Sequence, residues 1–196
     1  MPAPSCELQV AEKQELVPLS RTDFLTGLLN RRELMEELER AIERTTQNRA
    51  SSAVLFLDPN NFKYVNDTQG HDAGDRVLKK LAAALCRATH SYDFVVRLGT
   101  DEFVLWFENG DKETALCRAV AILASSRMLA EEVSLDPAKN LELSIGIAIF
   151  NADHPESAHK LMLRADDAMY HAKNNNKKNI AIACHWCGNG QESKKF

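Results

Sequence analysis

Residues 94–107 read FVVRLGTDEFVLWF, and this stretch carries the clearest structural signal in the chain. Two strand-like runs, Phe94–Leu98 and Phe103–Phe107, are separated by the four residues Gly99-Thr100-Asp101-Glu102. Aromatic and β-branched residues on both sides of a short polar segment predict a β-hairpin. The hairpin would present two adjacent carboxylates at its tip.

Around this hairpin, patterns typical of helices and strands alternate. Apolar residues at helical spacing predict four helices, over Arg32–Thr46, 76–88, Lys112–Leu129 and Ser157–Lys173. Short apolar runs predict strands over Ala53–Leu57, Leu141–Phe150 and Asn179–Ala183. The mixture of hairpin and crossover connections favours an α/β fold, a single-domain sandwich with a central mixed, mainly antiparallel sheet flanked by helices.

The stretch from Asn60 to Asp75 is rich in Asn, Asp and Gly, which predicts that it includes loop. Asp75 stands immediately before the helical pattern that starts at Arg76, where a carboxylate can cap the first turn. We therefore expect Asp75 to act as that cap.

The length of 196 residues and the 44% hydrophobic content suit one compact domain. We predict an N-terminal tail or connector over 1–20, the domain over 21–184 and a disordered tail over 185–196. No apolar run is long enough to span a bilayer and no secretory signal is visible, so we expect no membrane partner and a cytoplasmic location. No sensory module is visible in the N-terminal segment.

The net charge of −4 disfavours nonspecific nucleic-acid binding, which needs a basic face. An odd set of five scattered cysteines is typical of reduced thiols. Cys184 and Cys187 have metal-ligand spacing without a second pair, so a structural role and a metal or redox role both remain open.

Three carboxylates stand where strands should end, namely Asp58 after the first strand and Asp101 and Glu102 at the hairpin tip. If the hairpin packs beside that strand, they converge and repel one another unless a cation neutralises them. Mg²⁺ prefers such hard oxygen ligands and retains positions for substrate phosphates. The alternative is an acidic hairpin tip that is simply solvated.

A basic cluster near the end of the last helix could complement these carboxylates. Lys173 and Lys177 are four residues apart and share a face if the helix continues that far, with Lys178 beside them. Lysines near a magnesium site can hold phosphates as point charges. The alternative is a solvated helix end.

Five ordered stretches resemble the motifs of the GGDEF domain family, the diguanylate cyclases. Residues 23–32 (DFLTGLLNRR) resemble D-x-L-T-G-L-x-N-R-R, and residues 58–75 (DPNNFKYVNDTQGHDAGD) resemble D-x-D-x-F-K-x-x-N-D-x-x-G-H-x-x-G-D. Residues 97–103 (RLGTDEF) resemble R-x-G-G-D-E-F, and 144–148 (SIGIA) and 165–173 (ADDAMYHAK) complete the series. The matches run in family order over most of the chain.

The resemblance implies a metal site and a reaction. Asp58 and Glu102, with the carbonyl of Pro59, would bind Mg²⁺ or alternatively Mn²⁺, and Asp101 would serve as base or ligand near the 3′-hydroxyl. Two GTP molecules, one on each subunit of a transient homodimer, would condense to cyclic diguanylate with loss of pyrophosphate. The protein would contribute positioning and charge neutralisation.

The resemblance also implies how the substrate is held. Asn66 and Asp75 would bind guanine, and Gly99 would leave space for the nucleotide. Phe62 and Lys63 would flank the phosphate pocket, and Lys173 and Lys177 would bind the terminal phosphates.

The chain departs from the family pattern at several of these positions. Thr100 replaces the second glycine of the signature and would be strained if the turn requires positive φ, or would crowd the nucleotide. Asn60 replaces the second Asp of D-x-D. The family's inhibitory product site, R-x-x-D, is represented by His90 to Asp93 and lacks its arginine, so we expect weak product binding there.

The sequence therefore predicts a Mg²⁺-dependent diguanylate cyclase. The main alternative is a catalytically weak or inactive GGDEF domain that binds GTP and regulates a neighbour. A dimerisation module without a nucleotide is a third reading.

Overall fold

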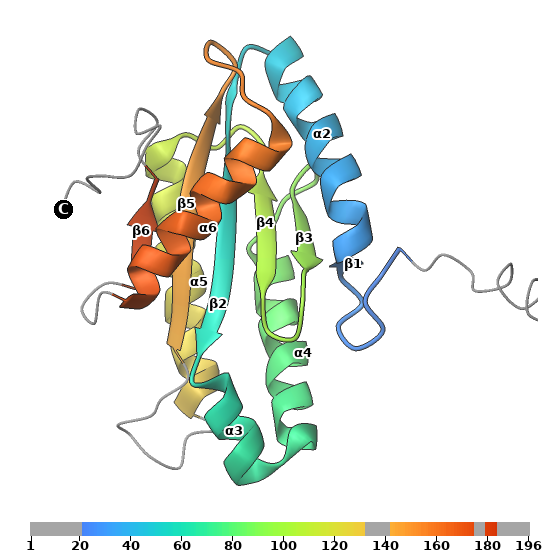
Figure 1. Ribbon diagram of the computed structural model, residues 1–196, viewed down its shortest axis with the longest axis vertical. Helices are drawn as coiled ribbons and strands as arrows, with labels where there is room; N and C mark the ends of the chain where they lie inside the picture. The colour runs from blue at the N-terminus through green and yellow to red at the C-terminus, as the bar shows by residue number, and fades with distance from the viewer. Residues whose placement is uncertain (1–20, 132–141, 175–178, 184–196) are drawn as a thin grey trace, which may run out of the picture.

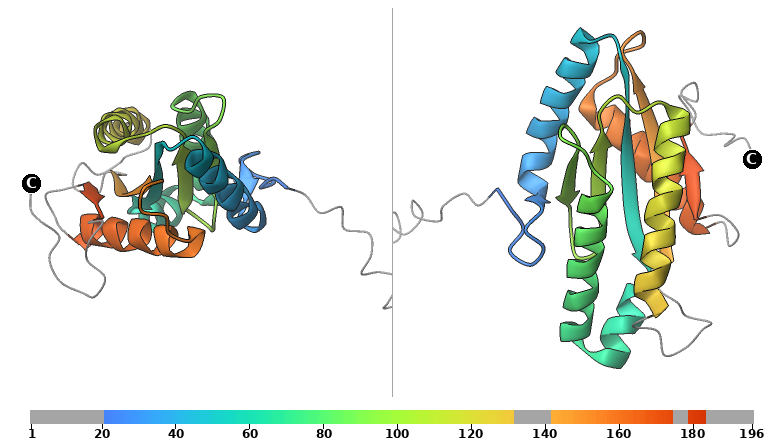
Figure 2. Two further views of the ribbon diagram at one scale, coloured as in Figure 1. Left: turned by 90° about the horizontal axis from the view of Figure 1, so that it is seen from above. Right: turned by 180° about the vertical axis from the view of Figure 1, so that it is seen from behind.

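The computed structural model describes residues 21–131, 142–174 and 179–183. These residues form one mixed sheet between two layers of helices (Figure 1 and Figure 2). The strands are β1 (Leu29–Asn30), β2 (Ser51–Asn60), β3 (Phe94–Arg97), β4 (Phe103–Phe107), β5 (Glu142–Asn151) and β6 (Ile180–Ile182). The helices are α2 (Arg31–Gln47), α3 (Phe62–Gln69), α4 (His71–Arg87), α5 (Lys112–Glu131) and α6 (Ala158–Asn174).

The sheet has the strand order β1-β3-β4-β2-β5-β6. Its four central strands pair antiparallel, whereas β1 on β3 and β6 on β5 are parallel edges. This arrangement confirms the predicted mixed, mainly antiparallel sheet, and β3 and β4 confirm the predicted hairpin.

The central strands bury both of their faces, because helices cover the sheet on each side. In β2, Ala53, Leu55 and Leu57 belong to the core under α4 and α5, and Val54 and Phe56 belong to the core under α2 and α6. The right-hand view of Figure 2 shows α4 and α5 on the face opposite α6. This two-sided burial explains why β2 reads as a continuous apolar run rather than as an alternating one.

The expectation that Asn60–Asp75 includes loop holds at Asn61 and Gly70, and the structure places α3 and the start of α4 over most of the stretch. The two helices are separated by Gly70, whose φ of 84° is accessible to glycine at no steric cost. Phe62 and Val65 are 4% exposed and join the core, so packing overrides the weak helix propensity of the segment. Asp75 lies inside α4 and does not cap it.

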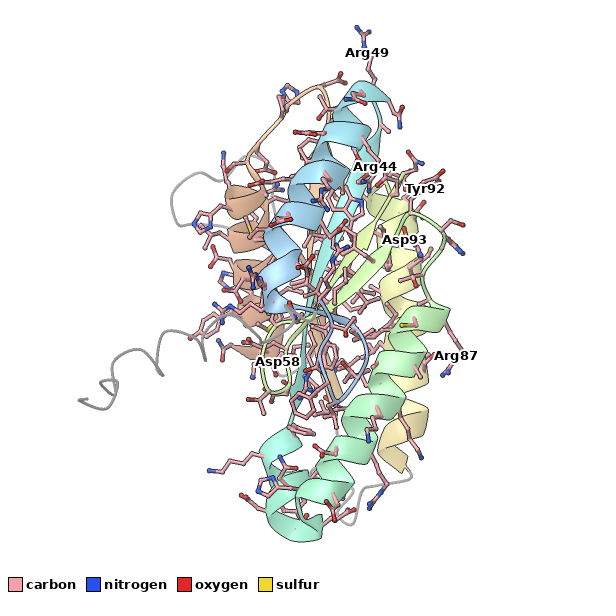
Figure 3. The ribbon with its side chains drawn as sticks, turned by 90° about the vertical axis from the view of Figure 1, so that its right-hand side faces the viewer. Arg44, Arg49, Asp58, Arg87, Tyr92 and Asp93 are labelled. Atoms are coloured by element: carbon pink, nitrogen blue, oxygen red, sulfur yellow. The ribbon has the colours of Figure 1, made fainter. Side chains whose placement is uncertain are left out.

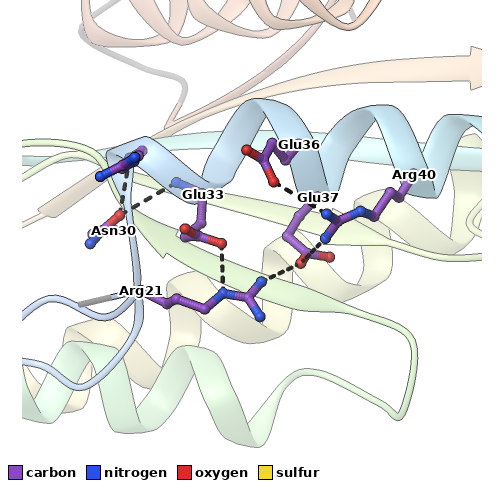
Figure 4. A network of polar contacts seen from close by, with 7 residues as sticks. Arg21, Asn30, Glu33, Glu36, Glu37 and Arg40 are labelled. Atoms are coloured by element: carbon purple, nitrogen blue, oxygen red, sulfur yellow. Dashed lines mark hydrogen bonds and ion pairs between the residues drawn. The ribbon is translucent and has the colours of Figure 1, made fainter. Parts of the chain in front are cut away.

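A polar network fixes the start of the described chain against α2 (Figure 4). The guanidinium of Arg21 donates to Glu33 at 2.6 Å and to Glu37 at 2.7 Å. The side chain of Asn30 caps α2 by accepting from the backbone N–H groups of its first turn. The direction of α2 is thereby set next to the edge strand β1.

The sequence predicts no segment long and apolar enough to span a bilayer, and the helices of the structure bear on the same point. Within 21–131, 142–174 and 179–183, no helix combines the length and the apolar character that crossing a bilayer requires.

Candidate active site

The hairpin tip and the end of β2 bring the three predicted carboxylates together. The pairing of β2 with β4 ends at Leu57 opposite Phe103, so Asp58 and Glu102 are the next residues on the two adjacent strands. Asp58 is 8% exposed, because β2 continues along β5 to Asn60 and keeps the residue inside the sheet. The strand register therefore brings the end of β2 and the hairpin tip together, as expected from the sequence.

The electrostatics show that these carboxylates share one environment. Burial raises the pKa of Asp101, and the charge of Asp58 raises it further. Burial also raises the pKa of Glu102, with added repulsion from Asp58, Asp101 and Asp166. Such mutual repulsion is relieved when a cation enters the cluster.

Lys173 supplies a cation to this cluster from α6. Its Nζ donates to both carboxylate oxygens of Asp58, at 2.9 and 2.8 Å. The lysine side chain is 44% exposed, so its ammonium reaches the site from solvent and can be redirected toward a ligand. α6 ends at Asn174, and Lys177 and Lys178 lie outside the described residues.

Two further residues at the end of β2 have clear structural positions. Pro59 is buried and pairs with Leu143 of β5, beyond the last pair with β4, so the absence of its N–H breaks no bond in the β2–β4 ladder. The side-chain amide of Asn60 donates to the hydroxyl of Ser144 at 2.9 Å. The Asn60 side chain therefore contacts β5. Its amide does not take the place of the second Asp that the family pattern has at this position.

The donor set fits a divalent cation that keeps ligands from substrate and water. Among the described residues, no three His, Cys, Asp or Glu side chains are grouped closely enough to hold a metal ion by themselves. Carboxylates from two strands, with a main-chain carbonyl, suit Mg²⁺ because it is commonly bound by one or two carboxylates plus phosphates. Asp58, Glu102 and the Pro59 carbonyl therefore stay the candidate ligands for such an ion.

The predicted base-binding residues lie on the two helices that follow β2. Gly74 of α4 faces Asn66 of α3, since a Cβ added to Gly74 would lie 1.9 Å from the Asn66 Oδ1. Asp75 is exposed beside them. Because Gly74 has no side chain, the Asn66 amide fits between α3 and α4.

The two residues predicted to flank the phosphates differ in exposure. The ring of Phe62 is packed in the core, so only its main chain is available to a nucleotide. Lys63 is exposed at the start of α3. Their roles toward phosphate remain predictions.

Two effects are predicted for Thr100, namely backbone strain and crowding of the nucleotide, and the structure excludes the first. In the described part of the chain, positive φ outside glycine occurs at Arg49, Asn61 and Asn109, and neither Gly99 nor Thr100 has positive φ. The expected backbone strain is therefore absent. Thr100 is exposed at the hairpin tip, so crowding of a nucleotide remains a prediction.

An ion pair missed by sequence reasoning holds the hairpin tip. Arg97 Nη1 donates to Asp23 Oδ1 at 2.8 Å, and Arg97 Nη2 donates to the Thr100 carbonyl at 2.7 Å. Asp23 also accepts from the Thr26 hydroxyl and backbone N–H. The loop before β1 is thus tied to the tip, although both residues appeared in the sequence only as parts of separate motifs.

The predicted degenerate product site lies away from the carboxylates, as Figure 3 shows for Asp93 and Asp58. Asp93 is paired with Arg118 of α5 and accepts from the backbone N–H groups of His90 and Glu108. Its carboxylate is therefore neutralised inside the fold and already has three partners. Weak product binding at His90 and Asp93 stays a prediction.

Two other charged residues near the site had no role assigned from the sequence. Asp166 lies seven residues before Lys173 on α6, and repulsion from Asp166 contributes to the raised pKa of Glu102. Arg31, the first residue of α2, acts on Glu102 in the opposite direction. Both lie within quoted motifs, but their approach to the hairpin depends on long-range packing.

Comparison with known proteins agrees with this fold. The family described as "Diguanylate cyclase, GGDEF domain" matches residues 20–179. The chain is 37% identical over 161 residues to the bifunctional diguanylate cyclase/cyclic di-GMP phosphodiesterase MucR of Pseudomonas aeruginosa, covering 82% of this chain and 23% of MucR. It is 35% identical over 164 residues to the diguanylate cyclase DosC of Escherichia coli, covering 82% of this chain and 34% of DosC.

Among solved structures, the GGDEF domain of TpbB (YfiN) from Pseudomonas aeruginosa has a TM-score of 0.72 and 35% identity. That match covers 83% of this chain and 94% of the other. The chain belongs to the GGDEF domain family. It spans about a quarter to a third of the curated relatives named above.

Proposed function

We propose that this chain is a Mg²⁺-dependent diguanylate cyclase that condenses two GTP molecules into cyclic diguanylate. The observation that carries the proposal is the convergence of Asp58, Asp101 and Glu102 at one end of the sheet with Lys173 bound to Asp58. Clustered carboxylates with an adjacent ammonium suit a site for a metal-bound triphosphate. The named relatives that synthesise cyclic diguanylate support the same reaction.

In this mechanism the chain's residues position a nucleotide and balance its charge. Asp58, Glu102 and the Pro59 carbonyl would hold Mg²⁺, which would neutralise phosphate charge. Lys173, whose Nζ donates to Asp58 in the structure, would donate to the terminal phosphates. Asp101 lies beside these groups and is the proposed acceptor of the 3′-hydroxyl proton.

Each chain holds one GTP, so synthesis of a cyclic dinucleotide requires two chains that face each other. Each 3′-oxygen forms a bond to the α-phosphorus of the other nucleotide, and the bond to pyrophosphate breaks. Two pyrophosphates and two protons leave for each product. The homodimer is therefore part of the proposal.

Guanine recognition is proposed for Asn66 and Asp75. An amide and a carboxylate can pair with the polar edges of guanine, and a site built this way rejects a base that leaves its groups unpaired.

The exposed thiols Cys86 and Cys117, which form no disulfide, fit a reducing compartment, and we propose a cytoplasmic location.

A second candidate function is a GTP-binding regulatory domain with little turnover. Thr100 favours it, because its exposed side chain occupies the hairpin tip where the family has glycine. This function shares the nucleotide site and lacks the condensation step.

Calorimetry with 3′-deoxy-GTP and Mg²⁺ tests the nucleotide site without turnover, since this analogue lacks the attacking hydroxyl. We expect binding that requires Mg²⁺ and exceeds binding of 3′-deoxy-ATP by at least about tenfold. Equal affinity for the two bases, or binding indifferent to Mg²⁺, would contradict the proposed site.

A further inference from the structure

The triphosphate of the proposed substrate needs cations, and most of those near the carboxylates already have partners. Lys173 is bound to Asp58, and Arg97 is bound to Asp23 and to the Thr100 carbonyl. Arg31 also acts electrostatically on this cluster. Its exposed guanidinium makes no hydrogen bond or salt bridge with any residue in the part of the chain that the structure describes.

The strand register places Arg31 beside the hairpin tip. β1 pairs with β3 in parallel, with Asn30 opposite Arg97, so Arg31 follows at the level of Leu98. The Leu98 N–H donates to the Glu102 carbonyl at 2.9 Å, which puts Glu102 across from Leu98. Two strand spacings, about 10 Å, therefore separate the backbones of Arg31 and Glu102. An arginine side chain can cover most of that distance.

The Glu102 side chain has a defined direction at this tip. A Cβ added to Gly99 would lie 3.3 Å from Glu102 Oε2, so the carboxylate folds over the glycine. The side chain of Asn30 already caps the first N–H groups of α2, at Arg32 and Glu33. The group that α2 offers to an anion is thus the Arg31 guanidinium rather than the helix end.

We propose that Arg31 binds a phosphate of the nucleoside triphosphate held at Asp58 and Glu102. This inference rests on the proposed function. A guanidinium presents paired N–H donors that match phosphate oxygens, and an arginine without another partner loses no existing contact when it binds them. Arg31 is then a substrate-contacting residue contributed by α2, on the β3 side of the site, opposite the lysine of α6.

The test is the dissociation constant of 3′-deoxy-GTP with Mg²⁺ at fixed salt, for three variants and the wild type. We expect Arg31→Ala to weaken binding by about tenfold or more, which corresponds to about 1.4 kcal/mol. Arg31→Lys should recover part of the loss, because it keeps the charge without the fork. Arg32→Ala is the matched control, since Arg32 is also exposed in the first turn of α2 and should stay within about twofold of wild type.

The Tm of each variant is measured alongside the dissociation constant, and Arg31→Ala should have the same Tm as the wild type. The inference is overturned if Arg31→Ala binds within about twofold of wild type, or if Arg31→Ala and Arg32→Ala weaken binding equally. If the wild type itself fails to prefer 3′-deoxy-GTP over 3′-deoxy-ATP, the proposed function fails, and this inference fails with it.

Discussion

The ion pair between Arg97 and Asp23 should couple the loop before β1 to the hairpin tip energetically. The two side chains are 9% and 16% exposed, and Nη1 lies 2.8 Å from Oδ1. Removing one partner of a buried pair costs about 3–5 kcal/mol, because the other charge is left uncompensated. Since both keep some contact with solvent, we expect about 3 kcal/mol for Arg97→Met. At about 2–4 °C per kcal/mol for a domain of this size, the Tm should fall by about 6–12 °C.

A double-mutant cycle measures the coupling directly. Urea unfolding of wild type, Arg97→Met, Asp23→Asn and the double variant should give a coupling energy above about 1.5 kcal/mol. The control cycle uses Arg40 and Glu36, an i,i+4 pair that is 54% and 66% exposed and should give about 0.3–0.5 kcal/mol. Additivity of the Arg97 and Asp23 variants within about 0.5 kcal/mol would refute the reasoning.

The same pair predicts a pH dependence. Burial opposes ionisation of Asp23, but hydrogen bonds from Thr26 and Arg97 outweigh it and hold its pKa below the ordinary 3.8. A carboxylate with a lowered folded pKa contributes stability that is complete above the unfolded pKa and is lost as pH falls through the folded pKa. Asp23→Asn should therefore show a constant stability deficit from about pH 6 to 8, which shrinks below about pH 4. A deficit that grows on acidification would contradict this sign.

Three further predictions concern the site and its support. Asp58→Asn and Glu102→Gln should each abolish pyrophosphate release with unchanged circular dichroism; near-normal release by either variant would remove that residue from the mechanism. Gly146→Ala should destabilise the fold by several kcal/mol in urea unfolding, because its Cβ would lie 2.1 Å from backbone atoms of α6; a loss below about 1 kcal/mol would count against this packing. Thr100→Gly should raise steady-state pyrophosphate release several-fold by relieving crowding and leave the Tm within about 2 °C, since no positive φ is present; an unchanged rate would make Thr100 a harmless substitution.

Local pattern was enough to predict the hairpin, the long helices and the mixed sheet. The hairpin and the helices depend on residues close in sequence, with apolar spacing that differs between helix and strand. The mixed sheet, whose strands pair over long separations, followed from the order of these elements and their connections. The helix α3 within Asn60–Asp75 was not predicted, because the composition of the stretch describes a weak local preference, whereas the burial of Phe62 and Val65 decides its structure.

The candidate site was predictable in its residue types and less so in its contacts. Strand register was sufficient to bring Asp58 to Glu102, because adjacent strands that end together place their next residues together. Lys173 lies 115 residues from Asp58, and Arg118 lies 25 residues from Asp93. Such pairs leave no periodic trace in the sequence. Lys173 was expected near the carboxylates as a phosphate ligand, but its direct contact with Asp58 and the pairing of Arg118 with Asp93 depend on how α6 and α5 pack on the sheet.

The reaction that we propose for this chain is the synthesis of cyclic diguanylate from GTP. The most direct measurement is incubation of the purified chain with labelled GTP and Mg²⁺, followed by separation of the nucleotides on an anion-exchange column. We expect cyclic diguanylate and pyrophosphate in a ratio of one to two, with no product when Mg²⁺ is chelated. Stable GTP binding without any cyclic product, at protein concentrations that permit dimers, would contradict the cyclase and favour the regulatory domain.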